Sequence, residues 1–136
     1  MPEIAPMSPE IKKILAPQGV LRAAINMSNF LLVSERTADG GPAGVSPDMA
    51  AAIAQALGLE VKYVPYPNPG VLADAASADE WDIALIGAEP QRAEVIAFTH
   101  AYTEIEATYL VPAGSDIHEV AEVDRKGRRI AVAERT

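Results

Sequence analysis

The residues with the clearest chemical potential follow the apolar segment 83–86, where Gly87, Pro90 and Arg92 come in quick succession. The segment is apolar without alternation, which predicts a central parallel strand covered on both faces. Gly87 permits a tight turn beyond the carboxyl end of that strand, where open α/β sheets bind ligands. Pro90 suits the first position of a helix, so free N–H groups and Arg92 would face one crevice. The pattern predicts a seat for a carboxylate, although an ordinary exposed arginine near a helix start fits it equally well.

Other site chemistries find little support in the sequence. His100 and His118 are the only histidines, have no metal-ligand spacing and are expected at the surface. There is no Gly-x-Ser-x-Gly elbow and no phosphate-binding glycine loop. Glu104 and Glu106 would share one face of a strand, as a carboxylate pair or, more simply, as solvated residues, and Trp81 is expected in the core or at its rim. No metal, cofactor or catalytic residue is predicted.

Composition narrows the class of protein. The chain has 136 residues, enough for a domain with a real core, and a formal net charge of −8, which argues against nucleic-acid binding. The absence of cysteine excludes a thiol nucleophile and any disulfide. No apolar run approaches the length of a membrane helix, and residues 1–19 lack the pattern of a secretory signal. Taken as it stands, the chain is expected to be soluble and unexported.

Local signals predict an alternation of helices and strands. Capping residues and prolines start helices at Ser8, Ser46 and Asn68, and Gly58 ends the second of them. The expected strands are Val20–Ile25, Leu59–Val64, the segment from Asp82, Glu104–Val111 and Arg129–Ala133, with a turn-rich loop or hairpin tip at 34–44 and a short amphipathic helix near Val120. Strands separated by helices form right-handed parallel crossovers. The sequence therefore predicts a three-layer α/β/α fold with a mostly parallel sheet.

Eight segments, taken in their order along the chain, resemble the segments of a known protein family. They are Leu21–Ile25, Gly44–Met49, Ala54–Leu59, Trp81–Ala84, Pro90–Ala93, Ala97–Tyr102, Tyr109–Ser115 and Gly127–Val132. With this order and spacing, the chain resembles the first lobe of the family 3 bacterial extracellular solute-binding proteins, the receptors of amino-acid uptake ABC transporters. The resemblance implies a periplasmic-binding-protein-like lobe at 20–112, preceded by a helical extension at 1–19 and followed by an incomplete start of a second lobe at 113–136.

The resemblance also implies roles for particular residues. It implies that Arg92 binds the α-carboxylate of the ligand. Such a contact is worth roughly 1.5–3 kcal/mol, or about ten- to hundred-fold in affinity. Gly87, Ala88 and Glu89 stand where the family has hydroxyl residues, Asn26 stands at the place of an acid that holds the ligand's amino group, and Asn29 stands near the place of a stacking aromatic. The complete predicted ligand set is Arg92, Gly87, Ala88, Glu89, Asn26, Ser28, Asn29, Tyr66, Asn68 and Thr136.

Three functions are open at this point. The first is a solute-binding component of an ABC-type uptake system, which would close on a small carboxylated metabolite between two lobes and partner a membrane permease. The second is an enzyme like the cyclohexadienyl dehydratases, which share the architecture and act on prephenate or arogenate; Glu89 would be the only carboxylate beside the site. The third is a truncated lobe that acts as a homodimer through its uncovered sheet edge. The resemblance implies a periplasmic location, whereas the missing signal pattern fits a cytoplasmic one.

Overall fold

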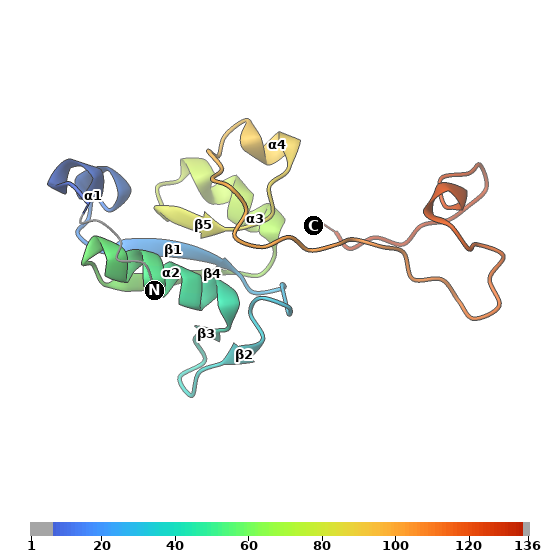
Figure 1. Cartoon of the computed structure of the whole chain (residues 1–136), viewed down its shortest axis with the longest axis horizontal. Helices are drawn as coiled ribbons and strands as arrows, with labels where there is room; N and C mark the ends of the chain where they lie inside the picture. Colours follow the sequence, from blue (N-terminus) through green and yellow to red (C-terminus); the bar gives the residue numbers. More distant parts are fainter. Residues whose placement is uncertain (1–6, 135–136) are drawn as a thin grey trace. The chain divides into compact units, whose positions relative to one another are not determined.

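A computed structural model describes residues 7–134, which divide into two compact units, residues 7–98 and Thr99–Glu134 (Figure 1). The first unit contains the secondary structure that positions the site. Its elements are α1 (Pro9–Leu15), β1 (Leu21–Asn26), β2 (Glu35–Arg36), β3 (Pro42–Ala43), α2 (Val45–Leu57), β4 (Val61–Tyr66), α3 (Pro69–Asp74), the 3-10 turn η1 (Ala75–Ser77), β5 (Ile83–Leu85) and α4 (Pro90–Ala93). The domain boundaries expected from the sequence stay a prediction.

The main sheet is parallel, with the strand order β4-β1-β5. Ala24 on β1 is level with Val64 on β4 and with Ala84 on β5. The prediction of a parallel sheet is confirmed, but the prediction that the segment 83–86 forms its central strand is wrong. Within the described residues, β5 pairs with β1 alone, and β1 is the strand with neighbours on both sides. An apolar run without alternation shows that a segment is covered, and it does not say how many strands flank it.

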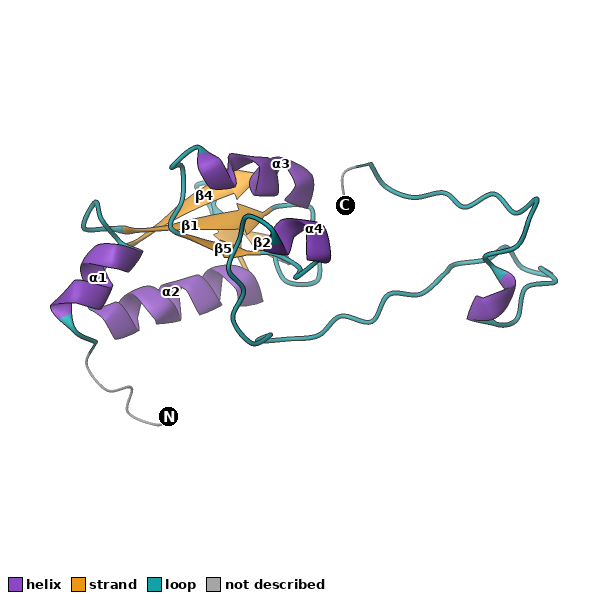
Figure 2. Ribbon diagram, turned by 90° about the horizontal axis from the view of Figure 1, so that it is seen from above, coloured by secondary structure: helices purple, strands orange, loops and turns teal. Residues whose placement is uncertain are grey.

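Helices cover both faces of this sheet, as Figure 2 shows, with α2 on one side and α3 on the other. Leu21, Ala23 and Ile25 alternate along β1 and pack in the clusters that contain the buried apolar residues Ala50, Ala54 and Leu57 of α2. Ala24 points to the opposite face, where it packs with Tyr66 and with Leu72 of α3. This period of two follows from the strand geometry, and it confirms the three-layer α/β/α architecture.

Local capping residues set three of the helix ends. Ser8 and Asn68 cap α1 and α3 through side-chain oxygens that accept from the N–H groups of Ile11 and Val71. Gly58 ends α2 in the left-handed conformation, as predicted.

The start of α2 differs from the prediction. Its N-cap is Gly44, and Ser46 lies within the first turn and is buried, so the prediction of a Ser46 cap is wrong. Gly44 has φ of +129°, and a Cβ there would lie 2.8 Å from the Leu32 carbonyl oxygen. The chain therefore enters α2 through a backbone conformation that a side chain would block.

The predicted turn-rich segment forms a small hairpin. Its strands β2 and β3 are antiparallel, with Glu35 opposite Ala43 and Arg36 opposite Pro42. Thr37 donates its backbone N–H to the Gly41 carbonyl, and Gly40 donates to the Thr37 carbonyl, which closes the tip. The hairpin interpretation is therefore the correct one.

The second unit, Thr99–Glu134, has little regular structure. Neither Glu104–Val111 nor Arg129–Ala133 is a strand, so both strand predictions are wrong, and the helix expected near Val120 is one 3-10 turn, η2 (Val120–Glu122). Alternating apolar and polar residues make a segment compatible with a strand. The strand forms only where a neighbouring strand can share its backbone hydrogen bonds. Glu119 and Glu122 cap that turn reciprocally, and Arg128 donates from Nη1 and Nη2 to the Asp116 carboxylate at 3.0 and 2.9 Å. Across the described residues, no helix has the length and apolarity required to cross a bilayer.

Candidate functional site

An open depression of about 320 Å³ lies between α3 and the turn that leads into α4. Its charged lining residues are Asp74 at the end of α3, and Glu89 and Arg92 around the start of α4. The remaining lining residues are Gly70, Ala73, Gln91 and Val95. The depression is therefore a mixed-charge surface, lined by one cation and two acids.

The predicted Arg92 is the cation of this depression. Its side chain is 10% exposed, so the guanidinium is largely covered rather than extended into bulk water. Nη1 donates to the Gly87 carbonyl oxygen at 3.1 Å and lies 3.2 Å from Oε1 of Glu89. A guanidinium has five N–H donors, so the two contacts made by Nη1 leave capacity for further acceptors.

The chain reaches this geometry through a short turn after β5. The strand ends at Leu85, Gly87 and Ala88 are exposed turn residues, and Glu89 is the N-cap of α4 without making a side-chain cap. The predicted helix start at Pro90 is confirmed, but α4 has only four residues. A single turn carries a small dipole, so most of the attraction for an anion comes from the Arg92 charge.

The predicted residues after β1 form a closed turn of their own. The Asn26 Oδ1 atom accepts from the backbone N–H of Ser28 at 3.1 Å and from its hydroxyl at 2.8 Å. The Asn29 Oδ1 atom accepts from the Leu32 N–H at 3.3 Å. These three side chains lie at the carboxyl ends of the parallel strands, as Arg92 does, but they do not line the depression. A ligand would have to extend beyond the depression to reach them.

Two further predicted residues have structural partners. Tyr66 is 7% exposed, packs in the core below α3, and donates its hydroxyl to Oε2 of Glu80 at 2.6 Å. Burial, and then the contact with Glu80, raises the pKa of Tyr66 to about 12. Asn68 uses its Oδ1 atom to cap α3. Thr136 lies outside the described residues, and its role stays a prediction.

Sequence reasoning missed two residues near this edge of the sheet. Asp74 reaches the depression from α3, so the expectation that Glu89 is the only carboxylate beside the site is wrong. Phe30, adjacent to the predicted Asn29, is 78% exposed and is the large aromatic of the loop after β1. Its adjacency to Asn29 was the available signal, whereas Asp74 had none, because its position depends on how α3 packs.

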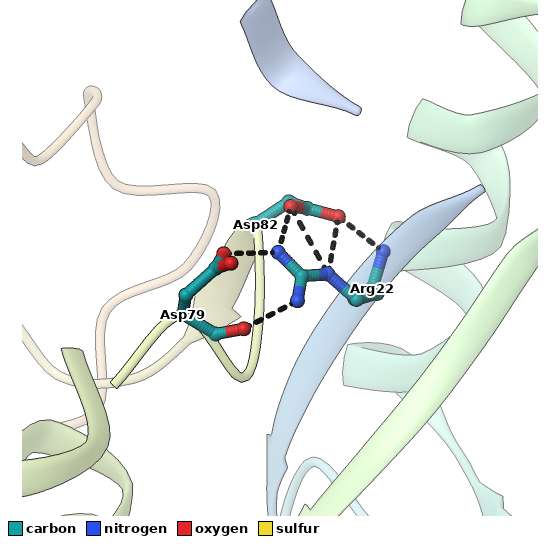
Figure 3. A network of polar contacts seen from close by, with 3 residues as sticks. All are labelled: Arg22, Asp79 and Asp82. Carbon is teal, nitrogen blue, oxygen red and sulfur yellow. Dashed lines mark hydrogen bonds and ion pairs between the residues drawn. The ribbon is translucent and has the colours of Figure 1, made fainter. Parts of the chain in front are cut away.

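A second charged cluster joins β1 to β5, and Figure 3 shows its geometry. Arg22 donates from Nε and Nη2 to Asp82, with an Nη2–Oδ1 distance of 2.6 Å, and from Nη2 to the Asp79 carboxylate at 2.8 Å. The contacts with Asp82, and then with Asp79, raise the pKa of Arg22. The side chains of Arg22 and Asp82 are 8% and 4% exposed, so this cluster has the burial of an internal ion pair rather than of a binding site.

The structure gives no support to the other site chemistries. Both histidines are exposed, and the described part of the chain contains no cluster of His, Cys, Asp or Glu that could hold a metal ion. Glu104 and Glu106 are exposed, as the favoured interpretation of solvated residues expects, but they lie outside any strand, so the strand face on which they would form a pair is absent. Trp81 packs against the cluster of Ala24, Tyr66 and Leu72, as a core or rim aromatic should.

Two known proteins resemble parts of this chain, one in sequence and one in structure. The cyclohexadienyl dehydratase of Pseudomonas aeruginosa is 41% identical over 69 residues, which cover 51% of this chain and 25% of that protein. The crystal structure of an ancestral cyclohexadienyl dehydratase matches with a TM-score of 0.51 and 29% identity, over 59% of this chain and 33% of that one. This chain thus spans only about a quarter to a third of these relatives.

The family itself is defined by a longer match. The model of the bacterial extracellular solute-binding proteins, family 3, matches residues 21–133, which include β1, the whole parallel sheet and Arg92. The parallel sheet with helices on both faces is consistent with a single lobe of that fold. The chain therefore belongs to the bacterial extracellular solute-binding proteins, family 3.

Proposed function

We propose that this lobe binds a small carboxylated metabolite, an amino acid or a similar compound, as part of the solute-binding component of an ABC-type uptake system. The partner would be a membrane permease, and the place of action would be the periplasm. The family membership supports the binding role. A second lobe would close over the ligand, as in other hinged receptors.

The observation that carries this proposal is the position of Arg92. Its guanidinium lies in the depression at the carboxyl end of β5, the edge of an open α/β sheet at which ligands bind. The guanidinium is mostly covered, which strengthens its interaction with an anion relative to a fully solvated arginine. The contact with Glu89, whose side chain is 50% exposed, can be exchanged for a ligand carboxylate.

A ligand panel tests this proposal. Amino acids and keto acids are added to the purified protein, and a true ligand raises Tm because it binds the folded state alone. Arg92→Gln should then weaken binding about ten- to hundred-fold. Arg125→Gln is a matched control, because Arg125 also pairs with an acid three residues earlier but is 59% exposed. A panel without any Tm shift, or equal binding by both variants, contradicts the proposal.

A dehydratase activity is the second candidate, supported by the names of the two similar proteins. Decarboxylative dehydration of prephenate or arogenate needs a general acid that protonates the leaving hydroxyl group. Glu89 and Asp74 are the carboxyl groups of the depression. The assay is the formation of phenylpyruvate from prephenate, with Glu89→Gln and Asp74→Asn as variants. Turnover that either variant abolishes would replace the binding role, and its absence in the unaltered protein would exclude this candidate.

Homodimerisation through the edge of β5 is the third candidate. Among the described residues this strand has one neighbour, and an unpaired strand edge invites pairing with another chain. Within Thr99–Glu134, the fully exposed Leu110 and the largely exposed Val132 offer further apolar contacts. Multi-angle light scattering of the purified chain distinguishes the states, and a monodisperse monomer at all concentrations contradicts the dimer.

A further inference from the structure

The guanidinium of Arg92 already holds a carboxylate, the side chain of Glu89. Nη1 lies 3.2 Å from Oε1, and the same nitrogen donates to the Gly87 carbonyl. Both charged residues line the depression, so an incoming ligand would meet them together. The carboxylate of Glu89 therefore occupies part of the guanidinium to which the carboxylate of a ligand would bind.

The charge of the surroundings favours some ligands over others. Asp74 adds a second acid to the lining, and the whole chain carries a formal net charge of −8. A ligand with only anionic groups must share Arg92 with Glu89 or displace it, and it enters a negative field in either case. A ligand that also carries an ammonium group can leave its carboxylate with Arg92 and turn the ammonium to the displaced Glu89.

We propose that Glu89 is a specificity-determining residue of the Arg92 site, an internal competitor that disfavours purely anionic ligands and retains those with a neighbouring cation. The inference rests on the proposed binding function and concerns this chain's own acid at the turn into α4. Glu89 is half exposed, so the competition has the strength of a surface ion pair, about two- to five-fold in affinity.

Matched pairs of keto and amino acids measure this discrimination. Pyruvate with L-alanine, and phenylpyruvate with L-phenylalanine, differ in the group that Glu89 would recognise. In Glu89→Gln, calorimetric titration should show keto acids binding about two- to five-fold more tightly and amino acids more weakly. Glu94→Gln, which removes an exposed acid from the end of the same helix, should leave the ratio unchanged. An unchanged ratio in Glu89→Gln, or an equal change in both variants, overturns the proposal.

A second measurement needs no ligand. Phenylglyoxal modifies arginine side chains, and peptide mass spectrometry reads the rate at each one. Glu89→Gln should raise the rate at Arg92 at least about two-fold relative to Arg125, because the covering carboxylate is lost. An unchanged rate overturns the role of Glu89 while leaving the binding function in place. A raised rate with no binding by any ligand instead overturns the binding function, and the specificity role with it.

Discussion

Arg22 and Asp82 are joined by their backbones as well as by their side chains. Asp82 donates its N–H to the Arg22 carbonyl at 2.9 Å, and Arg22 donates its own N–H to Oδ2 of Asp82 at 2.8 Å. The Arg22 guanidinium donates to the same Asp82 carboxylate, with Nη2 2.6 Å from Oδ1. This interaction fixes the start of β5 against the central strand, and thereby the turn that carries Arg92 at the other end of β5.

Removing one partner of this pair should destabilise the first unit strongly. Asp82→Asn leaves the Arg22 charge enclosed without its main partner, which costs far more than the loss of an exposed pair. We expect Tm to fall by at least about 10 °C in a calorimetric scan. Asp116→Asn is the control, because the pair of Asp116 with Arg128 is exposed and should shift Tm by no more than about 2 °C. Equal shifts would contradict an internal role for Asp82.

Gly44 should tolerate no side chain. Its φ of +129° suits glycine alone, and a Cβ would lie 2.8 Å from the Leu32 oxygen and 2.9 Å from the Ser34 nitrogen. Gly40 has a positive φ as well, but no atom lies within 4 Å of its added Cβ. Chemical denaturation should therefore give a loss of about 1 kcal/mol for Gly40→Ala and at least about twice that for Gly44→Ala. A smaller loss of stability for Gly44→Ala would mean that the backbone around Leu32 shifts to accommodate the added methyl group.

Much of the fold was predictable because its signals are local. Ser8, Asn68 and Gly58 act on helix ends a few residues away, so each can be recognised without knowing the tertiary structure. The position of β5 was not predictable in this way. Arg22 and Asp82 are 60 residues apart in the sequence, and nothing local indicates that they meet. Glu104–Val111 is the opposite case: its residue pattern predicts a strand, but it has no partner strand and is not a strand in the structure.

The residues of the candidate site also divide into those that local sequence could predict and those that depend on tertiary packing. Arg92 and Glu89 meet because one tight turn separates them, so their proximity could be read from the sequence. Asp74 enters the depression only through the packing of α3. Tyr66 was expected at the ligand, but the register of β4 places its ring on the core face beneath α3. Alternation along a strand predicts that successive residues face opposite sides, and the side that α3 covers becomes known only from the packing.

The stability of the protein should fall in alkaline solution because of Tyr66. Burial and Glu80 raise its pKa to about 12, above the value of about 10 for an unfolded tyrosine. Between these values the unfolded chain releases the proton and the folded chain retains it, so the free energy of unfolding decreases as pH rises. Urea denaturation from pH 9 to 12 measures the slope. In Tyr66→Phe the slope should be reduced, and an identical slope would show that another group titrates.

The role of Asn68 can be separated into helix capping and ligand contact by choosing the substitution. Asn68→Ala removes the acceptor of the Val71 N–H and should cost about 1 kcal/mol of stability in urea denaturation. Asn68→Ser restores a capping oxygen but lacks an amide group, so its stability should be close to that of the unaltered protein. If Asn68 acts only as a cap, Asn68→Ser binds the ligands found in the panel with unchanged affinity. A loss of binding at preserved stability would instead mean that the amide itself contacts the ligand, which the predicted ligand set requires.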